Sequence, residues 1–506
     1  MARVSSRRRK RGRAIADTPM ARPDPRRKIP VYELLDEASL VGLENHAEWL
    51  LTEIGIEIRG DAQALRLFKE AGVSVDGERL RFDPGHVRAL CSTAPKTYTM
   101  YARNPQRNIE FGGDNLILGP AYGSPFVTDL KHGRRYGTVE DFQNFIKLTY
   151  MTPFLQHQSG TVCEPVDVAV NKRHLDMVYA HLRYSDKPFM GSVTAAERAE
   201  DSLAMARIMF GEAFMQDHLV IQGNINVNSP LVYDDTMTGA LRTYAAANQG
   251  NVISSFILAG AMSPVTQAAL IAQAHAEVMV GIALSQLVRK GAPVVYGSFL
   301  TTMDLKTGAP TFGTPESSLT TMAISQLCRR LGLPFRCGGH LTASKLADAQ
   351  AMQESVDTMN PAIMAGANFI FQSAGWLEGG LTIGYEKFVM DLDRCGAMLR
   401  MTRGLSIDAN ELAADAYLEA GIGSNFLGVA HTLRNYRSAN YRAPLADTAS
   451  FEQWREDGSK DMQQRACDRW QQMLNEYQPP AIDPAIDEAL LDFIARKKSS
   501  MPDAWY

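Results

Sequence analysis

The chain has 506 residues, of which 45% are hydrophobic and 21% charged, and its net charge is −4. These values predict a large soluble core that exceeds one ordinary domain, although an α/β barrel with additions can absorb this length. No run of 18 or more apolar residues occurs, which argues against a membrane span.

The cysteines predict neither disulfides nor a metal site. None forms a Cys-x-x-Cys pair or stands at zinc-ligand spacing with a histidine, and elsewhere no cluster of His, Cys and carboxylates reaches the density of a metal site. We therefore expect a cytoplasmic protein with reduced, mostly buried cysteines and no tightly bound metal. The six cysteines are Cys91, Cys163, Cys328, Cys337, Cys395 and Cys467.

Charge is unevenly distributed along the chain. Residues 1–30 hold eleven Lys or Arg and two Asp, a net charge of +9, so the remainder carries −13. The basic run lacks the apolar stretch of a secretory signal. A solvated, disordered tail is favoured over a nucleic-acid arm, because nothing downstream resembles a nucleic-acid module.

Residues 31–112 are interpreted as an N-terminal α+β cap. Apolar residues at helical spacing predict a helix over residues 34–54 and a shorter one over 62–71. Two alternating runs on either side of Asp76-Gly77 predict a hairpin. A further helix from Pro84 and a strand over 96–102 complete this predicted cap.

Regular alternation of apolar runs and helical stretches begins near residue 113 and predicts a TIM (β/α)8 barrel over residues 113–402. No G-x-G-x-x-G follows the first run, which argues against a dinucleotide fold. Between the last two runs, Pro361 is expected to interrupt the helix of residues 344–365. The eight predicted strands are Leu116–Ala121, Phe154–Gly160, Pro188–Val193, Leu219–Val227, Val252–Ala259, Pro293–Phe299, Pro334–Gly338 and Asn368–Ala374.

After Met401 the alternation stops, and residues 403–506 are interpreted as a helical extension packed on the barrel. Helices are predicted over residues 410–419, 454–476 and 485–497.

Candidate site residues follow the predicted strands, because TIM-barrel active sites lie at the carboxyl ends of the strands. His340 comes after a Gly-Gly pair at a strand end and is the catalytic candidate, although a lone histidine is often structural. Solvated loop carboxylates and amides that fill a barrel layer are the competing interpretations of several others. The substrate-binding candidates are Tyr122, Glu164, Asn224, Asn226, Phe299, Gln372, Trp376 and Glu378.

Several segments together resemble the trimethylamine:corrinoid-protein methyltransferase family. Members of that family are TIM barrels that move a methyl group from an amine to the cobalt of a separate corrinoid protein, and the founding enzymes carry pyrrolysine near the position of His340. This chain has only standard residues there, so it resembles the non-pyrrolysine branch, which includes glycine betaine methyltransferases. The segments that carry the resemblance are 80–84, 94–105, 191–195, 308–316 and 372–381.

The resemblance implies demethylation of a quaternary amine, glycine betaine or a related betaine, with a corrinoid protein as partner. Attack of cobalt(I) on the methyl carbon releases a neutral tertiary amine, so no general acid is required, and the candidates include no evident acid–base pair. No tightly bound cofactor, nucleic acid or membrane is expected. A metal-free lyase or aldolase and a betaine-binding barrel without catalysis stay open as alternatives, and so does a homo-oligomer.

Overall fold

The computed structural model describes residues 24–505. Most of the predicted basic tail therefore lies outside the described residues. Its last part lies against the body of the protein, because the backbone N–H of Arg27 donates to the carbonyl of Asp114 and that of Lys28 donates to the carbonyl of Thr402, at 2.8 and 2.7 Å. All six cysteines are free thiols in the structure.

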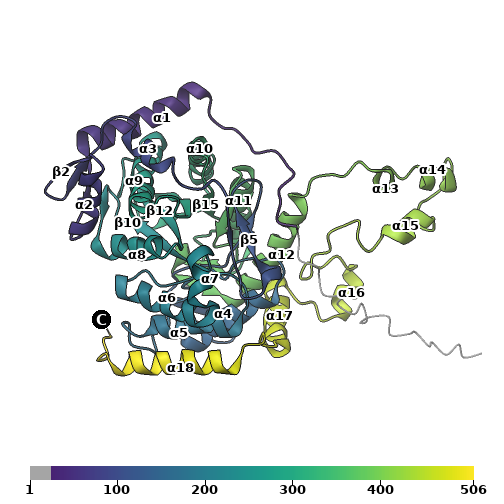
Figure 1. Ribbon diagram of the computed structural model, residues 1–506. Helices are drawn as coiled ribbons and strands as arrows, with labels where there is room; N and C mark the ends of the chain where they lie inside the picture. The colour runs from purple at the N-terminus through teal and green to yellow at the C-terminus, as the bar shows by residue number, and fades with distance from the viewer. Residues whose placement is uncertain (1–23, 506) are drawn as a thin grey trace, which may run out of the picture.

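A parallel seven-stranded sheet forms the centre of the protein (Figure 1). Each of its strands overlaps one of the predicted apolar runs, which confirms seven of the eight predicted strands, and two of them extend beyond the predicted bounds. A short segment, β14 (Pro310–Thr311), adds to the end of one strand in antiparallel orientation. In spatial order the seven strands are β6 (Ile117–Leu118), β16 (Phe369–Phe371), β15 (Phe335–Gly338), β13 (Val294–Met303), β12 (Gly250–Ala259), β10 (Ile221–Val227) and β9 (Phe189–Met190).

The prediction of a strand over Phe154–Gly160 is wrong, because side chains there replace backbone pairing. The side-chain oxygen of Gln156 accepts from the N–H of Leu118, and the Nδ1 atom of His157 accepts from the N–H of Ser159. Ser159 also has a left-handed φ of 61°, which breaks an extended path.

The same segment nevertheless touches both edges of the sheet. The backbone N–H of Gln156 donates to Leu118 of β6 at 3.0 Å, and the N–H of Gln158 donates to Pro188, next to β9, at 2.8 Å. Because one short segment reaches both edge strands, the sheet is strongly curled and has an inner and an outer face.

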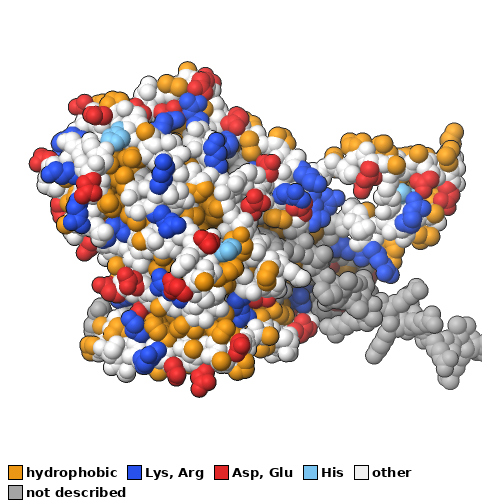
Figure 2. Space-filling model, viewed as in Figure 1, with side chains coloured by type: hydrophobic (Ala, Val, Ile, Leu, Met, Phe, Trp, Pro, Cys, Tyr) orange, Lys and Arg blue, Asp and Glu red, His pale blue; other side chains and the backbone are white. Residues whose placement is uncertain are grey.

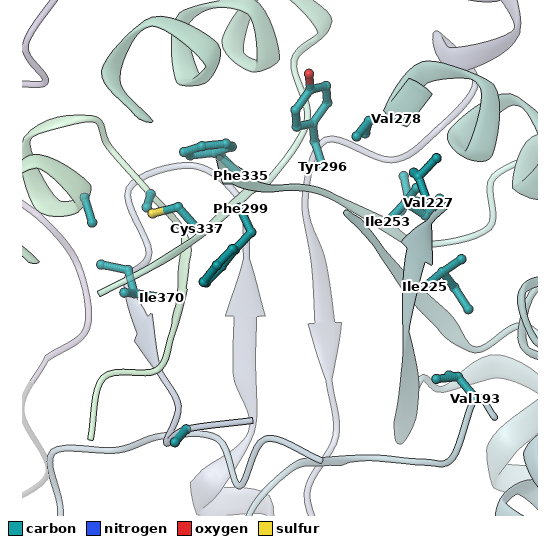
Figure 3. Packing of buried hydrophobic residues seen from close by; sticks show 14 of the residues in the cluster. Val193, Ile225, Val227, Ile253, Val278, Tyr296, Phe299, Phe335, Cys337 and Ile370 are labelled. Atoms are coloured by element: carbon teal, nitrogen blue, oxygen red, sulfur yellow. The ribbon is translucent and has the colours of Figure 1, made fainter. Parts of the chain in front are cut away.

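Helices cover the outer face and follow the strands along the chain. Figure 3 shows Ile253, Tyr296, Phe335 and Cys337 among the apolar side chains packed there. Thr138 and Asp141 form the capping box at the start of the first of these helices, where the hydroxyl and the carboxylate each accept from the other residue's backbone N–H. The helices are α4 (Val139–Met151), α5 (Arg173–Tyr184), α6 (Ala196–Phe210), α7 (Glu212–Asp217), α8 (Asp235–Ala246), α9 (Gln267–Val288), α10 (Pro315–Leu331), α11 (Ala349–Met364) and α12 (Tyr385–Met401).

Two of these helices show how burial shapes their sequence. Among the described residues, α9 alone is long and apolar enough to match a membrane span by length and composition, but 89% of its most apolar window is buried inside the protein. Its composition is that of a helix surrounded by protein. The prediction that Pro361 interrupts its helix is wrong: α11 continues, and the hydroxyl of Ser318 donates to the carbonyl of Asp357 that the proline leaves without its helical donor.

The N-terminal region contains the predicted helices and hairpin. The helices are α1 (Glu37–Trp49), a π-helical turn (Leu50–Ile54), α2 (Ala62–Glu70) and α3 (His86–Cys91). A small sheet contains β1 (Ile56–Ile58), the hairpin β2 (Ser74–Asp76) and β3 (Arg79–Arg81), and the later β11 (Val232–Tyr233).

A second hairpin from this region closes one end of the curled sheet. It consists of β4 (Tyr98–Met100) and β5 (Ile109–Phe111). Its side chains Met100 and Phe111 belong to one buried cluster with Val252, Val295 and Phe369 from the inner face. The amino-terminal end of the inner face is therefore filled with apolar side chains.

Past the carboxyl ends of the strands lies a four-stranded sheet. It contains β17 (Trp376–Leu377), β18 (Thr382–Gly384), β7 (Phe126–Asp129) and β8 (Gly133–Tyr136), with the 3-10 turn Glu378–Gly380 between the first two. Trp376 lies in this sheet, and Glu378 begins the turn between two of its strands.

The C-terminal region divides into an extended arm and two helices that pack on the body (Figure 1). The arm contains α13 (Ala409–Leu412), α14 (Ala414–Ala420) and α15 (Ala430–Asn435), and Figure 2 shows apolar side chains on its surface. After α16 (Phe451–Glu456), α17 (Met462–Glu476) packs against α12, and α18 (Pro484–Ser499) packs against α5 and α6.

Candidate active site

An aromatic cluster lies where the inner face meets the sheet that contains Trp376. The ring centroid of Phe299 is 5.7 Å from that of Trp376 and 5.9 Å from that of Phe312, and the last two are 6.0 Å apart. Phe256, whose ring centroid is 5.3 Å from that of Phe299, is 38% exposed. The cluster is therefore open to solvent on the side of Phe256.

A guanidinium group lies next to this cluster. The Cζ atom of Arg336 is 4.4 Å from the ring centroid of Phe371 and 5.7 Å from that of Phe299. Its Nη atoms donate to the carbonyl of Ser298 and to the side-chain oxygen of Gln372, each at 3.3 Å. Arg336 is 3% exposed, so a charged group sits inside the curled sheet.

The surroundings of Arg336 hold little to compensate its charge. Burial lowers the pKa of its guanidinium to about 10, with the Cys337 thiol and the Tyr122 phenol as the nearby groups that oppose this change. The side chain remains a cation at pH 7. Of the residues that the structure describes, none has a carboxylate oxygen within 4.0 Å of its nitrogens.

Further buried polar atoms on the inner face lack protein partners. Among the described residues they include the Nε atom of Arg336, both amide atoms of Gln222, the Oδ1 atom of Asn224 and the hydroxyl of Ser254. Buried polar atoms in folded proteins are almost always hydrogen-bonded, so a group of orphans on one face indicates a site for a polar ligand or water. Gly297 pairs with both Ser254 and Arg336 in the sheet and adds no side chain between them.

Two of the predicted residues, Tyr122 and Asn224, lie together on the inner face. The ring of Tyr122 stacks on that of Phe371 with centroids 6.0 Å apart. Burial raises the pKa of the Tyr122 phenol to about 12, and Asn224 is among the side chains whose hydrogen bonds oppose that shift. Asn226, two residues further along the strand, is exposed at the open end.

The two predicted carboxylates are paired with arginines. Glu164 forms an ion pair with Arg173, which opposes the rise in its pKa that burial causes. Glu378 accepts from Nε of Arg134 at 2.7 Å and from the hydroxyl of Thr382 at 2.6 Å. Both carboxylates therefore already have partners, and the structure adds no observation that directs them to a ligand.

His340 is held by groups beneath the end of β16. Its Nδ1 atom lies 2.7 Å from the carbonyl of Ser373 and 3.8 Å from the carboxylate of Asp391. Burial, assisted by the nearby Lys387 ammonium, lowers the pKa of the imidazole to about 3. The ring is therefore neutral at pH 7, and since a carbonyl only accepts, Nδ1 carries the proton and Nε2 is left with a lone pair.

The structure thus places Phe299 and Gln372 against Arg336 and Trp376 against Phe299, and it joins Tyr122 to Asn224 beside Phe371. Sequence reasoning missed Arg336, Phe256 and Phe312. The available signal for Arg336 was a charged residue inside an apolar strand. Within residues 24–505 no group of three or more His, Cys, Asp and Glu side chains could hold a metal ion.

Comparison with known proteins supports one family. Residues 3–502 match the family model described as trimethylamine methyltransferase (MTTB). The chain is 38% identical to the glycine betaine methyltransferase of Desulfitobacterium hafniense (strain Y51), over 93% of this chain and 98% of that one. It is 28% identical to the trimethylamine methyltransferase MttB of D. hafniense (strain DSM 10664 / DCB-2), over 88% and 90% of the two chains.

A third relative is the proline betaine:corrinoid methyltransferase of Eubacterium limosum, which is 27% identical over 82% of this chain and 85% of its own. The family match covers nearly the whole chain and includes every residue of the aromatic cluster and Arg336. The chain belongs to the trimethylamine methyltransferase (MTTB) family.

Proposed function

We propose that this protein transfers a methyl group from a betaine-type quaternary amine, glycine betaine or a close relative, to the cobalt(I) of a corrinoid protein. The observation that carries the proposal is the aromatic cluster of Phe256, Phe299, Phe312 and Trp376 at the open end of the inner face. Aromatic faces bind quaternary ammonium groups without donating a hydrogen bond, which such a cation could not accept. The names of two relatives, which act on glycine betaine and proline betaine, support the same substrate class.

The reaction needs little acid–base chemistry from the protein. The carbon–nitrogen bond breaks with its electron pair left on nitrogen, while cobalt(I) supplies the pair for the new cobalt–carbon bond. The leaving tertiary amine is neutral and needs no proton. A carboxylate against the ammonium would stabilise the charged substrate more than the transition state, in which positive charge on nitrogen falls, so aromatic faces suit the reaction better.

The remaining predicted residues are proposed to orient the substrate and exclude water. His340, with its ring fixed by Ser373 and its Nε2 able to accept, is proposed to orient the methyl donor. Gln372, Asn224 and Tyr122 are proposed to line the pocket, with Asn226, Glu164 and Glu378 nearer the surface. The methyl acceptor is the corrinoid of a partner protein that would approach the open end.

We also propose that segment 154–160 completes a TIM barrel as its eighth member, since its backbone bonds to β6 and to Pro188 beside β9 support closure. Residues 31–112 would then be its cap and 403–506 its helical extension, with 1–30 as a tail. Six unpaired cysteines support a location in the cytoplasm, where thiols stay reduced.

The decisive experiment combines the purified full chain with cob(I)alamin and a panel of quaternary amines. Appearance of the methylcobalamin spectrum with a betaine is expected. Binding of the same betaine without methyl transfer, to either free cob(I)alamin or a corrinoid protein, would instead favour a binding protein. Conversion of the betaine to products other than the demethylated amine would favour a lyase.

Ring substitutions test the aromatic cluster. Phe299→Leu and Trp376→Leu are each expected to weaken betaine binding by about 0.5–2 kcal/mol, measured by calorimetric titration. Phe451→Leu, at a ring that is 64% exposed on α16, is the matched control. His340→Ala should lower turnover, measured as methylcobalamin formation, more than it lowers affinity. Unchanged affinity in both ring variants, with wild-type turnover in the histidine variant, would show that the site lies elsewhere.

A further inference from the structure

We propose that Arg336 binds the carboxylate of the substrate, so that the site selects carboxylated quaternary amines over cations that lack a carboxylate. This inference rests on the proposed function and adds the group that recognises the other end of the substrate. The four Lys and Arg side chains that are buried among the described residues are Arg27, Lys187, Arg336 and Lys387. Arg336 has the weakest set of partners in this group.

The partners of the other three explain why they are buried. Lys387 contacts both carboxylate oxygens of Asp391 at 2.5 and 2.6 Å. Lys187 donates to three backbone carbonyls at 2.6 to 2.7 Å. Arg27 donates to two carbonyls and lies 3.9 Å from Asp114. A buried cation is expensive unless it is paired. The two lysines have close protein partners. Arg27 also has an unpartnered Nε atom and long bonds, at 3.5 and 3.3 Å, but the carboxylate of Asp114 lies within 4.0 Å of it.

Arg336 differs from Arg27 because no carboxylate of the described residues lies within 4.0 Å of its nitrogens, and its protein contacts also leave part of the guanidinium unused. Its two hydrogen bonds, at 3.3 Å, are long for a charged donor. Within residues 24–505 its Nε–H has no partner. Side-on pairing of an arginine with a carboxylate uses Nε–H together with an Nη–H, so the unpartnered atom is one that such a pair requires. The Nε–H edge of this buried guanidinium is therefore available to bind a carboxylate.

The position of Arg336 matches the dimensions of a betaine. Phe299 contacts both the guanidinium and Trp376, each at 5.7 Å. A substrate whose carboxylate meets Arg336 can therefore place its ammonium group against the aromatic cluster next to it. In glycine betaine a single methylene separates the two charged groups, which suits adjacent subsites.

The charge of Arg336 also provides discrimination. A quaternary ammonium without a carboxylate would approach a buried cation with no compensating anion, and like charges in a region of low dielectric repel strongly. A betaine brings its own anion and neutralises the arginine. The same residue thus attracts a zwitterion and opposes choline or tetramethylammonium.

The test is calorimetric titration of the full chain with glycine betaine and with choline, whose hydroxyl replaces the carboxylate. Wild-type protein is expected to prefer glycine betaine. Arg336→Met should weaken glycine betaine binding at least about tenfold, the loss expected for a charge-assisted pair, while choline binding stays the same or improves. Arg336→Lys keeps the positive charge but loses the planar pair of donors. Its affinity for glycine betaine should lie between those of wild-type protein and Arg336→Met. Arg27→Met, at another buried arginine far along the chain, is the control and should change neither affinity.

Two outcomes would overturn the inference. Equal losses for both ligands in Arg336→Met would mean that the arginine only supports the fold of the pocket, and unchanged glycine betaine binding would mean that the carboxylate binds elsewhere. If methyl transfer from betaine proceeds normally in either case, the proposed function survives and this inference alone fails. Absence of both binding and methyl transfer for every quaternary amine in wild-type protein would instead refute the proposed function.

A ligand-side measurement covers the case in which Arg336→Met does not fold. The methyl ester of glycine betaine retains the trimethylammonium group and loses the negative charge. Wild-type protein is expected to bind the ester at least about tenfold more weakly than glycine betaine, for the same reason. Equal affinity for acid and ester would overturn the inference without any variant.

Discussion

Two buried cations, Lys387 and Arg336, lie in neighbouring parts of the protein and are treated in opposite ways. Lys387 is completely buried and faces Asp391, whose carboxylate also accepts from the backbone N–H of Gly375 at 2.8 Å. Arg336 is buried among aromatic rings with two long hydrogen bonds and an unused Nε–H. The first arrangement serves the fold, because every charge in it is compensated within the chain.

The second arrangement serves the fold poorly, which is the reason to assign it to function. Local conflicts between sequence and stability are expected at binding sites, where the ligand supplies the missing partner. If this contrast is correct, removing the two cations should have opposite consequences. Loss of Lys387 should damage stability, and loss of Arg336 should damage binding.

The largest expected effect is the loss of stability in Lys387→Met. Removal of the ammonium leaves the carboxylate of Asp391 buried without its ion-pair partner, which destabilises by about 3–5 kcal/mol. Denaturant unfolding of the full chain measures this change. The double variant Lys387→Met with Asp391→Asn removes the unpaired charge, while the amide oxygen of the new side chain still accepts from Gly375. It should recover most of the free energy of unfolding that Lys387→Met loses. A single variant as stable as wild type would break the comparison.

Buried histidines are a third case, in which burial keeps a titratable side chain neutral. Burial lowers the pKa of His181 and of His275 to about 4, and that of His340 to about 3. In the unfolded chain each binds a proton near pH 6.5. Between about pH 6.5 and 4 the unfolded state therefore holds more protons, so the free energy of unfolding falls as the pH is lowered.

Each such histidine contributes a slope of about 1.4 kcal/mol per pH unit inside that window. Denaturant unfolding at several pH values measures the slope in wild-type protein and in His275→Gln. His275 packs against Tyr296, away from the inner face, with its Nδ1 atom 3.0 Å from the phenol oxygen. In the variant, the slope of the free energy of unfolding against pH should be smaller by the contribution of one histidine, whatever the stability of the variant at pH 7. Identical slopes in the two proteins would show that His275 is protonated in the folded state.

The strands were predictable because their burial leaves a direct trace in the sequence. Parallel strands covered on both faces form continuous apolar runs, and seven such runs became strands. The run at 154–160 failed because Gln156 and His157 bond to backbone N–H groups that a strand would use otherwise. Competition between side chain and backbone is invisible to hydrophobic periodicity.

The site was predictable only where a residue follows a strand directly. Trp376 and Gln372 were predicted in this way, because strand ends converge at one edge. Phe299 was predicted because it ends an apolar run, although β13 continues to Met303. Arg336 lies inside a strand, and whether it faces a helix or the inner face depends on the register with β13 and β16. Phe312 comes from a loop that returns to Trp376. The direction of the Arg336 side chain and the approach of Phe312 to Trp376 both depend on tertiary structure, which a single sequence does not reveal.

The smallest expected effect is on the stability of the ligand-free Arg336→Met variant. A small effect here is the most direct check of the contrast between Lys387 and Arg336. Removal of this guanidinium leaves no carboxylate unpaired within the described residues, and methionine fills a similar volume between Phe299 and Phe371. The lost bonds to Ser298 and Gln372 are long, and the desolvated cation no longer has to be accommodated. We therefore expect a change of about 1 kcal/mol or less in the free energy of unfolding, in contrast to Lys387→Met. Glycine betaine should raise the melting temperature of wild-type protein, because it binds only the folded state, and should do so much less in this variant. A loss of stability as large as that of Lys387→Met would show that Arg336 serves the stability of the fold and not ligand binding.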